Sequence, residues 1–333
     1  MSRKLLKYFG IIIGVLIFVL VFFYFKYRAP AQIEWGLTYS YQEAKGLGFD
    51  GRQMYLDILA DLKPKKIRLM SYWEDTEKSQ GQFDFSNIDW QLQQAAKYNT
   101  DVVLVVGRKQ PRWPECHQPD WYNQLSSAGQ DNAVVNMIKA NIEHFKSFSV
   151  IKAWQVENEP YFGFGPDCPK SSQSFFEKEV ALVKRLDSRS IVVTDSGERG
   201  SWLPVARSGA NILGSSVYRV SYDSKYGGYY KYPVPAIFYK IKQGFLETFT
   251  NINQVWDVEL QMEPWFTNGA LNTPLDTQKM LMNQKVFADN IGYAKRAGFG
   301  ENYLWGVEWW YWMAKKNGDF GMWTAAKDLF AGK

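Results

Sequence analysis

The sequence is poor in the side chains that most metal and redox sites need. Its 333 residues include only two histidines, His117 and His144, and two cysteines, Cys116 and Cys168. These numbers are too small for a zinc cluster of familiar spacing or for a disulfide-dense miniprotein. We therefore expect no metal site and no bound cofactor.

The sequence also lacks a charge excess outside its N-terminal segment. The formal net charge is +5, and five basic residues precede the first acidic residue, Glu34. These five are Arg3, Lys4, Lys7, Lys26 and Arg28. Without them the chain carries 34 basic and 34 acidic side chains. A neutral body offers no basic face for phosphates, so nucleic acid is not expected as a partner.

Internal repeats, low-complexity tracts and linker-like runs are absent as well, which indicates one globular domain. A composition of 46% hydrophobic and 22% charged residues excludes a disordered or collagen-like chain. Tryptophan, in contrast, is abundant, with 14 residues, all after position 32. Flat aromatic rings of this kind stack on sugars, although most tryptophans simply pack in the core.

The N-terminal segment contains the longest apolar run. From Phe9 to Phe25, 17 consecutive residues carry no charge, and at about 1.5 Å per residue they cover most of a ~30 Å hydrocarbon core. Tyr8, Tyr24 and Tyr27 suit the interfaces, and the flanking charges favour a cytoplasmic N-terminus. We expect a membrane anchor over 1–32, with a signal-anchor helix at about 9–25 in the lipid bilayer, and an extracytoplasmic domain over 33–333.

A cleaved signal peptide is the alternative for this segment. Ala29-Pro30-Ala31 has the small-x-small spacing that signal peptidase reads, and cleavage there would give a secreted protein. Both interpretations place the domain outside the cytosol, where Cys116 and Cys168 can pair. Each cysteine lies in a segment typical of a loop, so we expect a disulfide worth ~4 kcal/mol in the chain-entropy model. Two unrelated free thiols are the alternative.

Eight short apolar runs alternate with stretches that have helical spacing or with loops that could hold a helix. The expected strands are 33–40, 66–72, 101–107, 151–157, 191–195, 212–219, 254–261 and 302–308. The clearest expected helices are 50–62, 86–98, 132–148, 172–186 and 277–298. Asp50, Ser86 and Asp131 are suitable N-caps. Eight such units in about 300 residues predict a (β/α)8 TIM barrel. A doubly wound sheet is the competitor, but no Gly-x-Gly-x-x-Gly turn follows the first strand.

Carboxylates are concentrated where the fourth and seventh strands end, the place of the active site in such barrels. The fourth strand continues into Glu157-Asn158-Glu159-Pro160. In the seventh strand, alternation predicts that Trp256, Val258, Leu260 and Met262 face the helices, and that Asp257, Glu259 and Gln261 face the barrel axis. Two carboxyl groups across a cleft are the apparatus of glycoside hydrolysis, in which one stays protonated and the other ionised.

These motifs resemble the retaining glycosidases of clan A, the cellulase-like (β/α)8 family group. The likeness rests on Asn158-Glu159-Pro160, on a glutamate at the end of the seventh strand and on Arg68 in the second strand. Trp73, Glu74 and the segment Gly81-Gln82-Phe83-Asp84-Phe85-Ser86 resemble the region before the second helix in several members. The likeness extends along most of the chain after the N-terminal segment.

The resemblance implies a role for each of several residues. Glu159 would be the general acid/base and Glu259 the nucleophile, with their carboxyl groups about 5 to 5.5 Å apart. Asn158 would bind the hydroxyl next to the reacting carbon, and Arg68 would lie beside the nucleophile.

Other positions complete this expected site. Tyr218 would hydrogen-bond the nucleophile, and Trp305 would form the floor under the reacting sugar. Glu263 lies close to Glu259 in the sequence and is an alternative nucleophile. Lys109 and Trp113, after the third strand, are candidate substrate contacts.

The predicted function is therefore a membrane-anchored, extracytoplasmic retaining glycoside hydrolase. It would cleave β-glycosidic bonds of a poly- or oligosaccharide by double displacement. One alternative is a tethered, non-catalytic polysaccharide-binding barrel. Another is a barrel that acts as a scaffold in a membrane complex.

Overall fold

The computed structural model describes residues 3–26, 32–163, 165, 168–225 and 227–333. The possible cleavage site Ala29-Pro30-Ala31 and the interfacial Tyr27 lie outside these residues, as does the side chain of Tyr24.

Eight parallel strands close into a barrel in the order β1-β10-β9-β6-β5-β4-β3-β2. The strands are β1 (Glu34–Tyr39), β2 (Lys66–Met70), β3 (Asp101–Val106), β4 (Ile151–Val156), β5 (Ser190–Asp195), β6 (Ile212–Val217), β9 (Gln254–Gln261) and β10 (Glu301–Trp305). The predicted (β/α)8 barrel is therefore confirmed, and each predicted strand overlaps one of these eight. A two-stranded hairpin, β7 (Val220–Asp223) and β8 (Gly228–Lys231), follows β6 and was not predicted.

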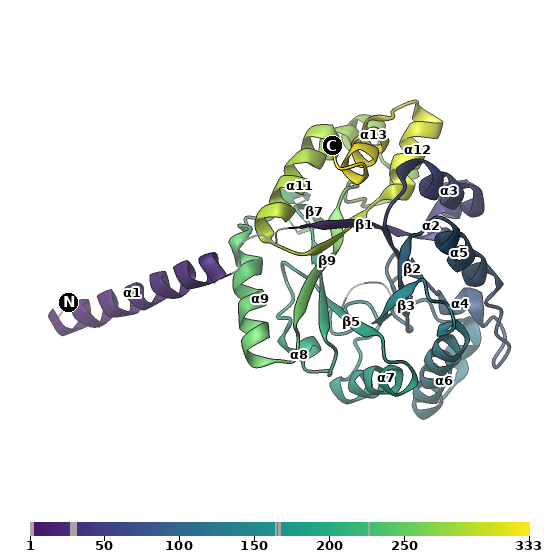
Figure 1. The fold of residues 1–333 in the computed structure, drawn as a ribbon, viewed down its shortest axis with the longest axis horizontal. Coiled ribbons are helices and arrows are strands. Elements are labelled where there is room, and N and C mark those ends of the chain that lie inside the picture. The colour runs from purple at the N-terminus through teal and green to yellow at the C-terminus, as the bar shows by residue number, and fades with distance from the viewer. Residues whose placement is uncertain (1–2, 27–31, 164, 166–167, 226) are drawn as a thin grey trace.

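Helices surround the barrel (Figure 1). They are α2 (Tyr41–Gly46), α3 (Gly51–Asp57), α4 (Trp73–Thr76), α5 (Ser86–Lys97), α6 (Ser127–Phe145), α7 (Gln173–Leu186), α8 (Leu203–Ala206), α9 (Ile237–Phe249), α10 (Leu275–Leu281), α11 (Gln284–Ala297), α12 (Val307–Asn317) and α13 (Gly321–Phe330). Shorter turns are the π-helix η1 (Ile58–Leu62) and the 3-10 helices η2 (Asp120–Gln124) and η3 (Ala270–Asn272).

Local capping explains where the helices depart from the predicted ranges. Asp50 caps α3 as expected, because its carboxylate accepts from the backbone N–H groups that follow it. Helix α6 instead begins after Ser126, and Asp131 lies inside it. The expected helix 277–298 is two helices, since Asn283 caps the start of α11. For α5, the side chain of Asp84 accepts from the backbone N–H of Ser86, which is the first helical residue.

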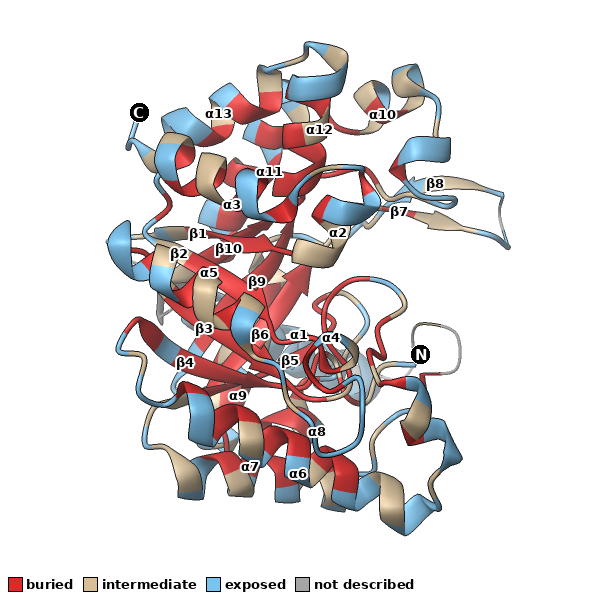
Figure 2. Cartoon of the chain, turned by 90° about the vertical axis from the view of Figure 1, so that its right-hand side faces the viewer, coloured by how far each residue is buried: buried red, intermediate tan, exposed pale blue. Residues whose placement is uncertain are grey.

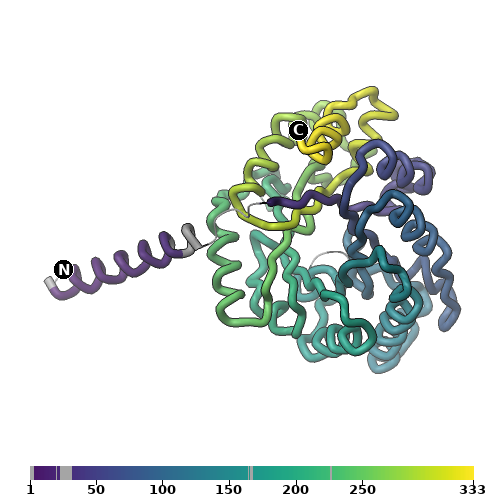
Figure 3. The backbone as a smooth tube through the Cα atoms, viewed as in Figure 1, coloured from purple at the N-terminus to yellow at the C-terminus, as the bar shows by residue number. Residues whose placement is uncertain are grey.

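The N-terminal helix α1 (Arg3–Lys26) contacts α9 and extends away from the barrel (Figure 3). Within the described ranges we find no helix that is both long enough and apolar enough to cross a membrane. The transmembrane anchor that the sequence predicts is therefore not supported by the structure.

Most of the hydrophobic core lies between the strands and the surrounding helices, whose outer faces are exposed (Figure 2). A smaller cluster contains side chains from six strands and none from a helix, so it fills the barrel interior. It consists of Val103, Ala153, Val192, Ile212, Trp256, Val258 and Tyr303. The prediction that Trp256 and Val258 face the helices is therefore wrong, whereas Leu260 and Met262 do belong to the outer core.

A bulge in β9 explains this error. Ser215 of β6 pairs with Asp257, and the next residue, Ser216, pairs with Glu259, which leaves Val258 as an extra residue. An extra residue interrupts the two-residue alternation of a strand. Glu259 then reaches the C-terminal end of the barrel, while the Asp257 carboxylate accepts from the Glu259 backbone N–H at 3.2 Å.

Candidate active site

A pocket of about 350 Å³ lies at the C-terminal ends of the barrel strands. Its walls come from the C-terminal ends of β6, β9 and β10, from the segments after β3, β4, β5, β6 and β9, and from the β7–β8 hairpin. Five of the predicted site residues line it: Asn158, Glu159, Tyr218, Glu259 and Trp305. The described residues include no group of three or more histidine, cysteine or acidic side chains that could hold a metal ion.

Glu159 is held just beyond β4. Its backbone N–H donates to Thr194 Oγ1 at 2.8 Å, and its carboxyl Oε1 accepts from Ser216 Oγ at 3.0 Å. Burial raises the pKa of Glu159 well above its usual range, and the neighbouring carboxylates of Glu259 and Glu115 raise it further. A raised pKa favours the protonated form of the Glu159 carboxyl, the form that a proton donor needs.

Glu259 lies in an opposite electrostatic environment. Its Oε1 accepts from Arg68 Nη1 at 3.1 Å, and its Oε2 accepts from the Tyr218 hydroxyl at 3.4 Å. Arg68 is fully buried and Glu259 is 7% exposed, so the pair is shielded from solvent. The guanidinium provides the counter-charge that an ionised carboxylate needs in such a place.

Arg68 also fixes Asn158. Its Nη2 donates to Asn158 Oδ1 at 2.9 Å, while its Nε donates to Gln155 Oε1 at 2.8 Å. Asn158 Oδ1 accepts additionally from Gln155 Nε2 and Thr194 Oγ1. With its oxygen occupied in this way, Asn158 presents its amide NH2 group to the pocket and to Glu115.

Glu115 is a further carboxyl group in the pocket, and the sequence did not predict it. It is 9% exposed and lies on the loop after β3. Burial raises its pKa to about 8, although Lys109 and a hydrogen bond from Asn158 act in the other direction. The one sequence signal that could have indicated it is its position next to Cys116, in the predicted disulfide.

Glu263, the alternative nucleophile, lies outside the residues that line the pocket. Its Oε1 accepts from Arg112 Nη1 and from Trp305 Nε1, the latter at 2.8 Å. Burial raises its pKa to about 7, against the opposing effect of Arg112. Glu308, expected at the end of the eighth strand, lies in the first turn of α12 and accepts from Arg112 Nη2 at 2.6 Å.

The two candidate substrate contacts do not line this pocket. Lys109 is 2% exposed, and its ammonium donates to the backbone carbonyls of Glu159 and Phe162 at 3.1 and 2.6 Å. Lys109 therefore fixes the backbone of the segment after β4 and does not contact the pocket. Trp113 is 64% exposed at the tip of the same loop.

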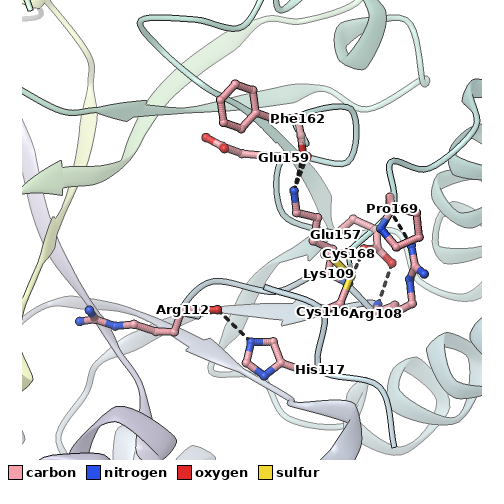
Figure 4. The surroundings of a disulfide bond; sticks show 10 residues. All are labelled: Arg108, Lys109, Arg112, Cys116, His117, Glu157, Glu159, Phe162, Cys168 and Pro169. Carbon is pink, nitrogen blue, oxygen red and sulfur yellow. Dashed lines mark hydrogen bonds between the residues drawn. A yellow bond between two sulfur atoms is a disulfide. The ribbon is translucent and has the colours of Figure 1, made fainter. Parts of the chain in front are cut away.

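The predicted disulfide between Cys116 and Cys168 is confirmed, with an S–S distance of 2.06 Å and Cα atoms 5.3 Å apart. It joins the loop after β3 to the loop after β4 (Figure 4). The bond lies next to Glu115 in the sequence and so ties one wall of the pocket to the segment that carries Glu159.

Comparison with protein-family models gives no match, and a search of curated proteins finds no similar sequence. Among solved structures, a variant of GH5_18 from Bifidobacterium longum in complex with Manβ1-4GlcNAc is similar. The TM-score is 0.63 at 11% sequence identity, over 90% of this chain and 78% of that chain. Xylanase 10B from Thermotoga maritima gives a TM-score of 0.59 at 13% identity, over 90% and 95% of the two chains.

A glycosylated endo-β-1,4-xylanase of glycoside hydrolase family 10 from Gloeophyllum trabeum is similar too. Its TM-score is 0.56 at 15% identity, over 83% of this chain and 84% of that chain. These neighbours are (β/α)8-barrel glycoside hydrolases of clan A, so the fold implied by the sequence resemblance is confirmed.

Proposed function

We propose that this protein is a retaining glycoside hydrolase that cleaves β-glycosidic bonds in two displacements. The observation that carries the proposal is the contrast between two carboxyl groups in one pocket. Burial and nearby carboxylates raise the pKa of Glu159, whereas Glu259 has a buried guanidinium and a tyrosine hydroxyl as partners. This difference in environment supports Glu159 as the acid and Glu259 as the nucleophile.

In the first step, Glu159 gives its proton to the glycosidic oxygen while Glu259 attacks the anomeric carbon. The leaving sugar departs as an alcohol, and the remaining sugar is bound covalently to Glu259. In the second step, Glu159 removes a proton from water, which attacks the same carbon and releases the sugar with retained β-configuration. This two-step mechanism requires the carboxyl groups of Glu159 and Glu259 to lie about 5 to 5.5 Å apart.

Contacts of the other residues support the roles that the resemblance implies. Arg68 and Tyr218 orient the Glu259 carboxylate, and Asn158 directs an amide donor towards the sugar hydroxyl next to the reacting carbon. Trp305 lines the pocket with its Nε1 fixed by Glu263. Because Glu259 lines the pocket and Glu263 does not, Glu259 is the better nucleophile.

We also propose that the barrel works outside the cytosol and that α1 attaches it to a membrane. Disulfides persist in oxidising compartments, and the Cys116–Cys168 bond fits such a location. Apolar side chains of α1 are exposed, among them Phe9 at 60% and Phe18 at 70%. Exposed apolar surface of this kind is typical of contacts with lipid or with another protein.

The decisive experiment compares Glu159→Ala and Glu259→Ala on aryl β-glycosides with good and poor leaving groups. Glu159→Ala should impair poor leaving groups far more than good ones, because an activated aryl group needs little protonation. Azide needs no base, so it should restore turnover of Glu159→Ala with retained configuration. Glu259→Ala should lose activity on every substrate, and any azide rescue should give the inverted product.

Glu263→Gln serves as the matched control, because it changes a carboxylate close to the nucleophile in the sequence. It should still form a glycosyl-enzyme. Inverted product from the unmodified protein would refute the retaining mechanism. Sugar binding without hydrolysis of any glycoside would instead favour a non-catalytic polysaccharide-binding barrel.

A further inference from the structure

The loop after β3 forms a strap across the mouth of the barrel. This strap, residues 107–117, doubles back on itself, since the His117 N–H donates to the Arg108 carbonyl at 2.9 Å and the Gln110 N–H to the Glu115 carbonyl at 2.8 Å. Most of its residues are buried, and Trp113 at its tip is the exposed exception among residues 109–117. The strap is therefore an integral part of the packed barrel.

One end of the strap is fixed to the segment after β4. The Glu157 carboxylate accepts from the Arg108 and Lys109 N–H groups at 2.7 and 2.6 Å. This approach requires Gly107, which has φ +128° and whose Cβ, if present, would lie 2.6 Å from Glu157 Oε1. The disulfide at Cys116 secures the returning half of the strap.

The opposite end of the strap is fixed on the far side of the mouth. The Arg112 side chain points away from the disulfide (Figure 4) and pairs with Glu263, beyond β9, and with Glu308, in α12. Its guanidinium lies 4.0 Å from the centroid of the Trp305 ring. The strap therefore spans from β4 to β9 and β10.

The middle of the strap covers the end of β2. Gln110 Nε2 donates to the Ser71 carbonyl at 2.7 Å, and the Tyr72 hydroxyl donates to the Pro111 carbonyl at 3.0 Å. Ser40, at the end of β1, donates its N–H to Glu308. Among the described residues, none that lines the pocket follows β1 or β2.

The pocket instead continues past Glu159. Its lining includes Glu198 and Arg199 after β5 and Tyr222 and Tyr230 of the β7–β8 hairpin. The proton donor must stand beside the glycosidic oxygen, so this is the side on which the leaving group lies. The sugar that carries the reacting carbon lies on the other side of that bond, towards Trp305, whose ring lies against the strap residue Arg112.

We propose that the strap closes the pocket behind the reacting sugar, so that the enzyme removes one sugar at a time from the non-reducing end of a β-linked chain. A chain that continued beyond the reacting sugar would have to cross the strap, which is held by the disulfide and by the pairs of Arg112. This inference rests on the proposed glycosidase activity and adds the position of the cut.

The test uses the full chain and β-1,4-linked manno-, gluco- and xylo-pentaoses labelled at the reducing end. A second set carries a methyl group on the terminal non-reducing 4-hydroxyl. At less than about 10% conversion, chromatography with mass spectrometry should show a monosaccharide and a labelled tetraose from an accepted pentaose. The methyl-capped counterpart should react at least about 100-fold more slowly. Early release of a disaccharide or longer fragment, or cleavage of the capped chain within about twofold of the free chain, would overturn the proposal.

Arg112→Ala extends the test by removing the far attachment of the strap. This variant should begin to release disaccharide and should accept the capped pentaose. Arg189→Ala is the matched control, because Arg189 pairs with Asp187 outside the strap and the pocket lining and should leave single-sugar release unchanged. If Arg112→Ala does not fold, the capped and uncapped substrates still decide the question with the unmodified chain.

The outcomes separate this inference from the proposed function. Hydrolysis of internal bonds would leave the protein a glycosidase and refute the closed pocket. No hydrolysis of any pentaose or aryl β-glycoside would refute the proposed function, and the inference that depends on it would fall with it.

Discussion

Replacing Glu115 with glutamine should make the stability of the protein less sensitive to pH. Burial raises the pKa of Glu115 to about 8, whereas a glutamate in an unfolded chain has a pKa of about 4.3. Between these two values the folded state holds one proton more than the unfolded chain. Because the folded state binds the extra proton, its stability falls as the pH rises through this window.

The size of the effect follows from the two pKa values. Each unit of difference corresponds to about 1.4 kcal/mol, which gives an upper limit of about 4 kcal/mol between pH 5 and pH 9, because the unfolded-state pKa lies below pH 5. Reorganisation around Asn158 would reduce it, so we expect about 2 to 4 kcal/mol. Glutamine has the shape of a protonated glutamate and cannot ionise. Glu115→Gln should therefore match the unmodified protein at pH 5 and be more stable at pH 9.

The assay is the midpoint of thermal unfolding at pH 5, 7 and 9, where about 2 kcal/mol corresponds to roughly 3 °C for a barrel of this size. Glu198 and Glu263 also have pKa values raised by burial to about 7, but they are common to both proteins and cancel in the difference. Glu143→Gln, which changes a 47% exposed glutamate of α6, should follow the unmodified protein at every pH. An equal difference between Glu115→Gln and the unmodified protein at pH 5 and pH 9 would refute the reasoning.

Two further predictions concern the covalent bond and the N-terminal segment. Replacing both Cys116 and Cys168 with serine should lower the free energy of unfolding by ~4 kcal/mol, since the bond links positions 52 residues apart; an unfolding midpoint that reductant does not change in the unmodified protein would contradict this. Deleting residues 1–31 should leave a folded, active barrel that no longer sediments with membranes, because every strand begins after this segment. Loss of its circular dichroism signal would show that the segment is needed for folding, and equal membrane binding with and without it would refute attachment through α1.

The barrel could be predicted because its signals are local. Each strand of a parallel sheet is buried on both faces and therefore reads as a short apolar run, and β9 has the same bounds in the sequence analysis and in the structure. The β7–β8 hairpin lacked such a signal, since its eight residues are mostly half-exposed or exposed. The bulge at Val258 could not be predicted from the sequence for another reason, because it depends on how β9 pairs with β6.

The site, too, contains residues that local sequence patterns predict and residues that only tertiary contacts position. Glu159 and Glu259 could be predicted to share a pocket, because strand ends meet at one face of a barrel. The environment of Arg112 could not, since its partners Glu263 and Glu308 are 151 and 196 residues away. Loop residues such as Glu115 are positioned by tertiary contacts of this kind rather than by a repeating pattern.

The strap also accounts for carboxylates that exceed the needs of catalysis. Glu157 accepts from the backbone N–H groups of Arg108 and Lys109 at one end of the strap. Glu263 and Glu308 pair with Arg112 at the other end of the strap. Buried carboxylates are costly unless they are paired or hydrogen-bonded. Three buried carboxylates from other segments bind this one loop, which indicates that a fixed position of the strap is important to the protein.

Such a fixed strap should also determine the strength of the acid. Burial is the main cause of the raised pKa of Glu159, and the strap, through Glu115, is one wall of the pocket that buries it. In Arg112→Ala a loosened strap would admit water, and hydration favours the ionised form of a carboxyl group, so the pKa of Glu159 would fall. A general acid acts only while protonated, and the alkaline limb of the kcat/KM profile should therefore move to lower pH. The profile should be measured on a substrate with a poor leaving group, because such a group depends on protonation. An alkaline limb that stays in place in a folded Arg112→Ala protein would show that the strap does not control the acidity of Glu159.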